Sequence, residues 1–273
     1  MNERDRLRQP LDADALRARV TDAGWQQFDV VAQTGSTNAD LLARAASGAD
    51  IDGAVLVAEH QTAGRGRQGR GWSATPRAQI TMSVGVAVVD VPVRAWGWLT
   101  LATGVAVLDA LDVDAPQLAA TGVQTGLKWP NDVLAGGGKL AGILAEVARP
   151  YVVIGLGLNV TQGPEEVDGP GATSLLDLGV AAPDRGALVV TLLDKLAARI
   201  AAWRAAHGAD PRLAADYRAR CLTLGNRVRA ELPGGGQVVG TARDIDDQGR
   251  LCIRTDDTQT DTVVSAGDVV HLR

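Results

Sequence analysis

The sequence contains few of the residues from which metal centres and nucleophilic triads are usually built. Its 273 residues include two cysteines and three histidines, and no HExxH or CxxC spacing appears. A structural zinc site typically needs four such ligands, so we expect no metal site made by a side-chain cluster. Because Cys221 and Cys252 are far apart, we expect two free thiols in a reduced, cytoplasmic environment.

Long apolar runs are also missing. No stretch approaches about 18 consecutive apolar residues, so no membrane span is expected. The first twenty residues have no apolar core, which argues against a signal peptide. The formal net charge is −5, and this acidic balance argues against a dedicated DNA-binding protein. The segment before the first expected strand is also too short for a helix-turn-helix domain.

One basic segment contrasts with this acidic background. Residues 61–72 read QTAGRGRQGRGW, in which four glycines alternate with Arg65, Arg67 and Arg70. Glycine lets the backbone approach a ligand closely, and arginine offers a charged fork for carboxylates and phosphates. Taken alone, the segment fits either a small-anion site or a solvated basic loop that touches nucleic acid.

Periodicity predicts strands and helices together over most of the chain, followed by strands only. Expected strands lie at residues 27–33, 54–60, 79–88, 128–135, 139–147 and 151–160, and expected helices at 12–23, 39–48, 94–112 and 184–207. The glycines at 136–138 indicate a hairpin. After about residue 222, five short alternating runs are typical of a small barrel. We therefore expect one domain over residues 1–222 and a second over 223–273.

Three further polar clusters accompany the basic segment. Residues 36–38 (STN) precede an expected helix, where helix capping alone would explain them. Residues 128–132 (KWPND) place a proline in a strand-like run, which turn chemistry alone would also explain. Lys139 follows three glycines and precedes an apolar strand, so it is either a hairpin lysine in solvent or a compact charge in a site.

Together, the clusters supply several fixed positive charges but no nucleophile–base pair. Only His60 among the histidines lies beside a cluster, and no GxxxxGK[ST] motif is present. Such a site suits a reaction in which the substrates supply the nucleophile. Adenylation is one example, because a carboxylate attacks an α-phosphate, pyrophosphate leaves, and catalysis consists of positioning and charge neutralisation.

The motifs HQTAGRGRQGRGW, TGSTN, KWPND, GGKLAGIL and GLGLNV together resemble those of the biotin–protein ligases. The similarity covers roughly residues 30–178, and the tail resembles the family's C-terminal SH3-like domain. The resemblance implies an α+β fold similar to the catalytic domains of class II aminoacyl-tRNA synthetases, with a mixed, largely antiparallel sheet flanked by helices. It implies a monofunctional ligase without repressor activity, because the DNA-binding domain of the bifunctional members is not seen.

The same resemblance implies a two-step reaction with ATP and Mg²⁺ as cofactors. Biotin and ATP form biotinyl-5′-AMP, and the biotinyl group then passes to one lysine of a biotin carboxyl carrier domain of an acyl-CoA carboxylase. We expect no DNA or membrane partner and a monomer or weak homodimer. The alternatives are a lipoate or octanoyl protein ligase of the same fold, and an RNA-binding module built on the arginines.

The resemblance also assigns roles to individual residues. The expected biotin-binding positions are Ser36, Thr37, Asn38, Gln61, Arg65, Gly66, Arg67 and Lys139. The expected adenylate-binding positions are Arg67, Arg70, Trp72, Asn131, Asn159 and Lys139. Of these, Lys139, Arg67 and Arg65 are expected to be catalytic. Asp132 matches an acidic position that we assign to Mg²⁺ or to handling of the acceptor lysine.

Overall fold

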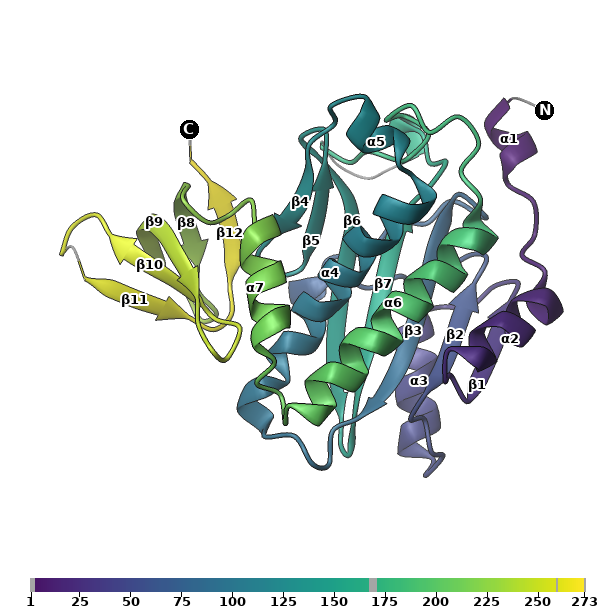
Figure 1. The fold of residues 1–273 in the computed structure, drawn as a ribbon, viewed down its shortest axis with the longest axis horizontal. Helices are drawn as coiled ribbons and strands as arrows, with labels where there is room; N and C mark the ends of the chain where they lie inside the picture. Colours follow the sequence, from purple (N-terminus) through teal and green to yellow (C-terminus); the bar gives the residue numbers. More distant parts are fainter. Residues whose placement is uncertain (1–2, 167–170, 259, 273) are drawn as a thin grey trace.

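The computed structural model describes residues 3–166, 171–258 and 260–272. These residues form a seven-stranded sheet with helices on both faces and a separate five-stranded sheet at the C-terminal end (Figure 1). The helices are α1 (Glu3–Leu7), α2 (Ala13–Asp22), α3 (Thr37–Ala46), α4 (Gly97–Asp114), α5 (Gln117–Ala120), α6 (Arg185–Ala205) and α7 (Pro211–Arg220). Asp12, Ser36, Asp184 and Asp210 cap the first turns of α2, α3, α6 and α7 with their side chains.

The large sheet contains seven strands in the order β1-β2-β3-β7-β6-β5-β4. They are β1 (Gln27–Val31), β2 (Ala54–Ala58), β3 (Gln79–Ala87), β4 (Thr125–Lys128), β5 (Asp132–Ala135), β6 (Gly138–Ala148) and β7 (Tyr151–Asn159). Only β1 and β2 pair in parallel, and every other neighbouring pair is antiparallel. The expected mixed, largely antiparallel sheet flanked by helices is therefore confirmed.

The small sheet is antiparallel throughout, in the order β11-β10-β9-β8-β12. Its strands are β8 (Arg227–Glu231), β9 (Gln237–Ile245), β10 (Leu251–Thr255), β11 (Asp261–Val264) and β12 (Asp268–His271). Two tryptophans outside the small sheet hold one of its turns by hydrogen bonds. Trp98 Nε1 donates to the carbonyl of Asp247 at 2.8 Å, and Trp129 Nε1 donates to the carbonyl of Gly249 at 2.9 Å. One turn of the small sheet is thus fixed beside the large one.

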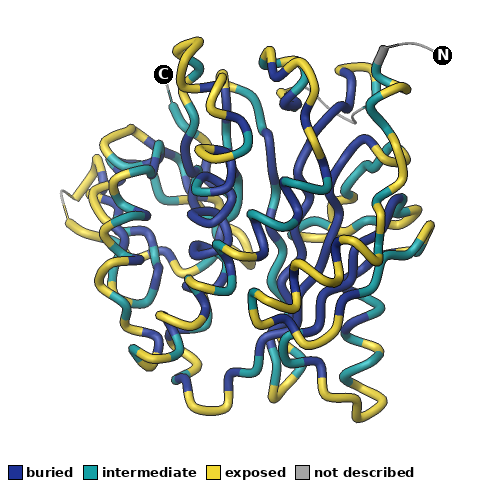
Figure 2. The backbone as a smooth tube through the Cα atoms, turned by 45° about the vertical axis from the view of Figure 1, so that its right-hand side comes forward, coloured by how far each residue is buried: buried dark blue, intermediate teal, exposed yellow. Residues whose placement is uncertain are grey.

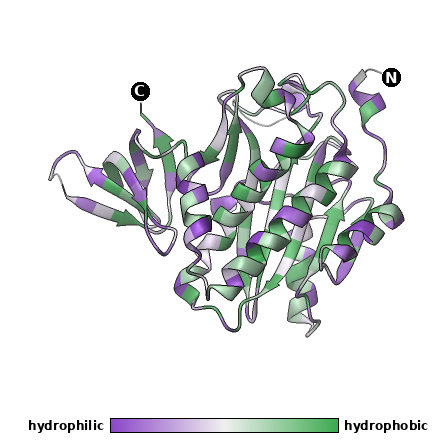
Figure 3. Ribbon diagram, in the orientation of Figure 1, coloured by the Kyte–Doolittle hydropathy of each residue, from purple (hydrophilic) through white to green (hydrophobic). Residues whose placement is uncertain are grey.

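Alternating side chains give the large sheet two different faces. On β3, Ile80, Met82 and Val84 join the main core beneath α4 and α6, which cross the front of the sheet in Figure 1. On the opposite face, Leu41 of α3 packs in a second, smaller core with Val153 of β7. The buried strands between these layers are dark blue in Figure 2 and mostly green in Figure 3.

One described helix, over Val93–Asp114, is long and apolar enough to cross a membrane by length and composition alone. It includes α4, and 67% of its apolar window is buried inside the protein. Its apolar residues therefore face the sheet and α6, as in a core helix.

Two features of the fold differ from the sequence-based expectations. The single strand expected at 128–135 is wrong, because β4 ends at Lys128, the chain turns through residues 129–131, and β5 returns antiparallel to it. Pro130 has no N–H for a strand ladder, so the chain bends there. The helices α1, α5 and α7 were not anticipated. The hairpin at the glycines is confirmed, since Gly136 and Gly137 have φ of 57° and 82° between β5 and β6.

Candidate active site

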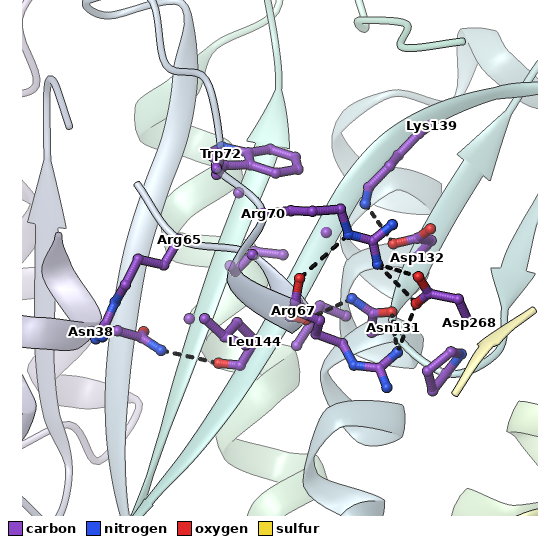
Figure 4. Close-up of a pocket in the computed structure, with 18 of the residues that line it drawn as sticks. Asn38, Arg65, Arg67, Arg70, Trp72, Asn131, Asp132, Lys139, Leu144 and Asp268 are labelled. Atoms are coloured by element: carbon purple, nitrogen blue, oxygen red, sulfur yellow. Dashed lines mark hydrogen bonds and ion pairs between the residues drawn. The ribbon is translucent and has the colours of Figure 1, made fainter. Parts of the chain in front are cut away.

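A cavity of about 410 Å³ brings most of the expected site residues together. It lies between the start of α3, the arginine loop (residues 61–72), the turn at 128–132, strands β6 and β7, and strand β12 of the small sheet (Figure 4). Among the residues that line it are Ser36, Thr37, Asn38, Gln61, Arg65, Gly66, Arg67, Arg70, Trp72, Asn131, Asp132 and Lys139.

Two glycines on neighbouring strands form the floor of the cavity beneath an indole ring. Gly142 of β6 and Gly157 of β7 are directly opposite each other, and the indole of Trp72 lies on them. A Cβ added at residue 157 would lie 2.2 Å from Trp72 Cε2, and one added at residue 142 would lie 2.8 Å from Trp72 Cζ3. Both positions therefore need glycine for the indole to occupy this place.

A β-bulge turns Lys139 toward this floor. The register of β5 against β6 shifts, so that Val133 pairs with Ala141 but Leu134 pairs with Lys139. The extra residue, Leu140, is fully buried in the main core. Because side chains alternate along a strand, regular pairing without the bulge would place Leu140 on the cavity face and Lys139 on the core face.

The ammonium of Lys139 is held between a carboxylate and an aromatic ring. Its Nζ lies 2.7 Å from Asp132 Oδ1 and 5.5 Å from the centre of the Trp72 ring (Figure 4). The side chain of Lys139 is 38% exposed, so the ammonium is open to an incoming anion. A compact charge on a flexible stem can leave Asp132 for a more negative group without moving the backbone.

The start of α3 forms a polar end of the cavity. Ser36 caps the helix, but Thr37 and Asn38 do not, so capping explains only part of the STN cluster. The backbone N–H and Oγ1 of Thr37 donate to Gln61 Oε1 at 2.8 and 3.0 Å. Asn38 Nδ2 donates to Glu146 Oε2 at 2.7 Å. These buried and half-buried side chains offer both donors and acceptors to a polar head group.

The three arginines of the loop contact carboxylates, a side-chain amide and carbonyls around the cavity (Figure 4). Arg65 Nη2 lies 3.3 Å from Glu146 Oε2. Arg67 Nη1 donates to Asn131 Oδ1 and to the carbonyl of Gly267, each at 3.2 Å. Burial lowers the pKa of Arg67, an effect that the charge of Asp268 opposes. The guanidinium of Arg67 is therefore partly desolvated, which strengthens its interaction with an anion.

Arg70 is bound to the small sheet. Its Nη2 lies 2.7 Å from Asp268 Oδ2, and Asp268 Oδ1 is 3.9 Å from Arg67 Nη1. The reasoning from sequence missed Asp268 and Glu146. Neither belongs to a motif, and Asp268 is about 200 residues from its partners along the chain, so no local signal points to it.

The arginine loop closes on itself over the cavity. Trp72 N donates to the carbonyl of Gly64 at 2.9 Å, and Gly66 N donates to that of Arg70 at 2.7 Å. A Cβ on residue 64 would lie 2.4 Å from the carbonyl oxygen of Trp72, so only glycine fits there. The loop is thus a compact hairpin-like turn, and its three arginines line the cavity.

Asn159 does not line the cavity, unlike the other expected site residues. It is buried behind Lys139, where its Nδ2 donates to the carbonyls of Lys139 at 3.3 Å and of Thr173 at 3.0 Å. Its contact with the site therefore runs through the backbone of Lys139, and direct contact with a nucleotide stays a prediction.

Comparison with known proteins gives the family. Residues 30–159 match the biotin/lipoate A/B protein ligase family, and residues 223–272 match the biotin protein ligase C-terminal domain. The chain is 71% identical over 275 residues to the biotin–[acetyl-CoA-carboxylase] ligase of Mycobacterium tuberculosis, covering all of both chains. The chain belongs to the biotin/lipoate A/B protein ligase family. The resemblance inferred from the sequence motifs is therefore confirmed, and with it ATP-dependent biotin ligase chemistry.

Other ligases of this family match less closely. The bifunctional ligase/repressor BirA of Bacillus subtilis is 32% identical over 250 residues, covering 89% of this chain and 73% of the relative. The Leishmania major biotin protein ligase in complex with biotinyl-5-AMP has 26% identity and a TM-score of 0.59, with 87% and 98% coverage. The Aquifex aeolicus biotin protein ligase in complex with biotin and ATP shares the fold, with a TM-score of 0.75, 24% identity, and 91% and 99% coverage.

Proposed function

We propose that the protein joins biotin to one lysine of a biotin carboxyl carrier domain of an acyl-CoA carboxylase, through enzyme-held biotinyl-5′-AMP. The name of the 71% identical relative supports a carboxylase as the acceptor. The observation that carries the proposal is the cavity itself, in which Lys139 and three loop arginines surround a glycine floor. Its described lining contains no cysteine or histidine, which suits substrates that supply the nucleophile.

In the first step, the biotin carboxylate attacks the α-phosphate of ATP and pyrophosphate leaves. The ureido ring of biotin binds at the polar end, where Thr37, Asn38 and Gln61 offer donors and acceptors. Lys139 leaves Asp132 to stabilise the negative charge that is redistributed between the carboxylate and the phosphate. Arg65 meets the carboxylate from the loop above the floor.

The adenylate is held by the opposite end of the cavity. Arg67 and Arg70 bind the phosphate, while Trp72 and Asn131 contact the nucleoside and keep it over the floor. Asn159 lies behind the cavity and holds the backbone carbonyl of Lys139 in place. Biotinyl-5′-AMP is a mixed anhydride and reacts with water. The arginine loop protects it by closing over it and excluding solvent.

Mg²⁺ is expected to enter with ATP. No group of three or more His, Cys, Asp or Glu side chains in the described ranges could hold a metal ion by itself. Mg²⁺ is commonly bound by one or two carboxylates together with substrate phosphates. Asp132 faces the cavity and fits that role once Lys139 has turned to the substrate. The ion would neutralise phosphate charge there.

In the second step, the amine of the acceptor lysine attacks the biotinyl carbonyl and AMP leaves. Arg67 neutralises the charge of the leaving phosphate, so the same residue retains the intermediate and assists its transfer. We further propose that residues 1–222 form the catalytic domain and 223–273 a separate SH3-like domain, and that the protein is a cytoplasmic monomer or weak homodimer without a DNA or membrane partner.

Biotin-dependent pyrophosphate exchange tests this function, with lipoate and octanoate as competing acids. Hydrogen-bonding groups at Thr37, Asn38 and Gln61 favour a ureido ring over an alkyl chain. We expect exchange with biotin and transfer of the label to a purified carrier domain. Exchange with lipoate or octanoate but not with biotin would show the alternative ligase of the same fold. Salt-sensitive RNA binding without ATP consumption would favour the RNA-binding module.

A further inference from the structure

A buried amide, Gln79, lies between two site residues that come from different elements. It begins β3 directly opposite Asn159 at the end of β7, and only 3% of its surface is exposed. Its Oε1 accepts from Trp72 Nε1 at 3.2 Å, and its Nε2 donates to Asn159 Oδ1 at 2.8 Å. We propose that Gln79 is a positioning residue that couples the Trp72 indole to Lys139 through Asn159. The proposal rests on the roles proposed above for Trp72 and Lys139.

The direction of this chain of hydrogen bonds is set at both ends. The indole N–H of Trp72 can only donate, so Oε1 of Gln79 must face it. At the other end, Asn159 Nδ2 meets the carbonyls of Lys139 and Thr173, which can only accept. Each amide therefore has a single orientation in which every donor meets an acceptor.

Further contacts hold the Gln79 amide in that orientation. Its Nε2 also lies 3.0 Å from the carbonyl oxygen of Ser73 and close to Gln162 Oε1, so three acceptors surround its two N–H groups. Gln162 Nε2 in turn donates to the carbonyl of Glu166 at 2.7 Å. An unpaired buried amide is costly, so a satisfied network of this kind allows few other rotamers. Gln79 thus restrains both the indole of Trp72 and the backbone of the next residue, Ser73.

The four residues close a ring of contacts around the floor. Lys139 Nζ lies 5.5 Å from the centre of the Trp72 ring, and the backbone of Lys139 is held by Asn159. Loss of Gln79 should therefore displace Trp72 and Lys139 together. It should affect the nucleotide end of the cavity more than the polar end at Gln61, because, among the described residues, Gln79 is not hydrogen-bonded to Thr37 or Gln61.

The test is a double-mutant cycle on biotin-dependent pyrophosphate release by the full chain, with Gln79→Met, Trp72→Phe and the double variant. Phenylalanine keeps an aromatic ring but lacks the N–H that Gln79 accepts. Each single change should lower kcat/KM for ATP roughly fivefold to tenfold. The double variant should lose little more than the worse single variant. The KM for biotin should change by less than about twofold, because the polar end is intact.

Thr81→Val is the matched control, two residues further along β3. Thr81 is buried and its Oγ1 donates to the carbonyl of Ala58 at 2.6 Å, so its loss should lower the thermal midpoint without lowering kcat/KM for ATP. If Gln79→Met does not fold, Gln79→Asn enters the cycle, because it keeps a neutral amide that is too short to reach the indole.

The possible failures are separable. Losses that multiply in the double variant, or an unimpaired Trp72→Phe, would overturn the coupling while wild-type pyrophosphate release still supports the proposed function. An equal fall in kcat/KM for ATP in Thr81→Val would also overturn it, since general destabilisation would then explain the effect. Absence of biotin-dependent release in the wild-type protein would instead contradict the proposed function itself.

Discussion

The ammonium of Lys139 and the carboxylate of Asp132 lie 2.7 Å apart at the edge of the glycine floor. The two residues come from neighbouring strands, and the bulge beside them turns Lys139 away from the core. Asp132 therefore holds the lysine in place before a substrate arrives. A substrate carboxylate next to a phosphate is more negative than Asp132 and can replace it as the partner of Lys139. The ion pair therefore keeps the ammonium at the place where the reaction needs a positive charge.

Asp268 should restrain the arginine loop in the ligand-free protein. Asp268→Asn removes the ion pair with Arg70, so protease cleavage within residues 61–72 should become roughly twofold to fivefold faster. Biotin with ATP should slow cleavage in both proteins, because the adenylate then binds the arginines. Asp261→Asn, which removes an exposed ion pair with Arg254 in the same sheet, is the control. Unchanged cleavage in Asp268→Asn would argue against the restraint.

Gly157 should be required for the position of Trp72. In Gly157→Ala the new Cβ would lie 2.2 Å from the indole, so the ring must move off the floor. Adenylate formation should fall by about tenfold or more, because overpacking of this kind displaces side chains. Gly97→Ala is the control, since its Cβ would meet its nearest atom at 3.4 Å. Equal activities of the two variants, measured by pyrophosphate release, would show that the indole need not lie there.

Arg67 should retain the intermediate more than it retains biotin. Arg67→Ala removes a partly desolvated charge near the phosphate, which should cost on the order of 1.5–3 kcal/mol of adenylate binding. Dissociation of biotinyl-AMP should accelerate, and labelling of unrelated lysines should rise. Arg94→Ala, at an exposed position outside the cavity, should change neither. An adenylate dissociation rate equal to that of the wild type would contradict this role.

His271 should make the protein less stable in mild acid. Its Nε2 lies 3.1 Å from Thr223 Oγ1, and burial together with the charge of Lys128 lowers the pKa of its imidazole below 6.5. The unfolded chain therefore binds a proton more readily than the folded one, so stability is fully present above the unfolded pKa and falls as pH drops below it.

The check is urea unfolding at about pH 7.5 and about pH 5, on either side of the ordinary histidine pKa. The wild type should lose more free energy of unfolding over this interval than His271→Gln, which cannot take up the proton. The other two histidines are present in both proteins and serve as the internal background. The same loss in both proteins would remove His271 as the cause.

Much of this architecture could be predicted from the sequence, because alternation and helical spacing are local. The strands around β3 and β7, the helix α6 and the glycine hairpin before Lys139 all follow from such patterns. The gathering of the polar clusters around one cavity followed from the family resemblance, since no local rule brings residue 38 beside residue 146.

Other features depend on contacts that a local pattern does not contain. The bulge at Leu140 adds one residue to an apolar run, and alternation alone would place Lys139 on the core face. The partners of Arg65 and Arg70, Glu146 and Asp268, were missed because the sequence does not tell which of many carboxylates a distant arginine will meet.

Lys139 is the residue on which the proposed adenylation depends most, and biotin-dependent pyrophosphate release by Lys139→Ala tests its role most directly. A preorganised charge of this kind is worth about 10²–10³ in rate, so release should nearly disappear while the thermal midpoint stays close to that of the wild type. Lys139→Arg should restore little, because a planar fork is not a compact ammonium. Lys195→Ala, a half-buried lysine of α6 outside the cavity, should retain full activity. Near wild-type release by a folded Lys139→Ala would contradict the account.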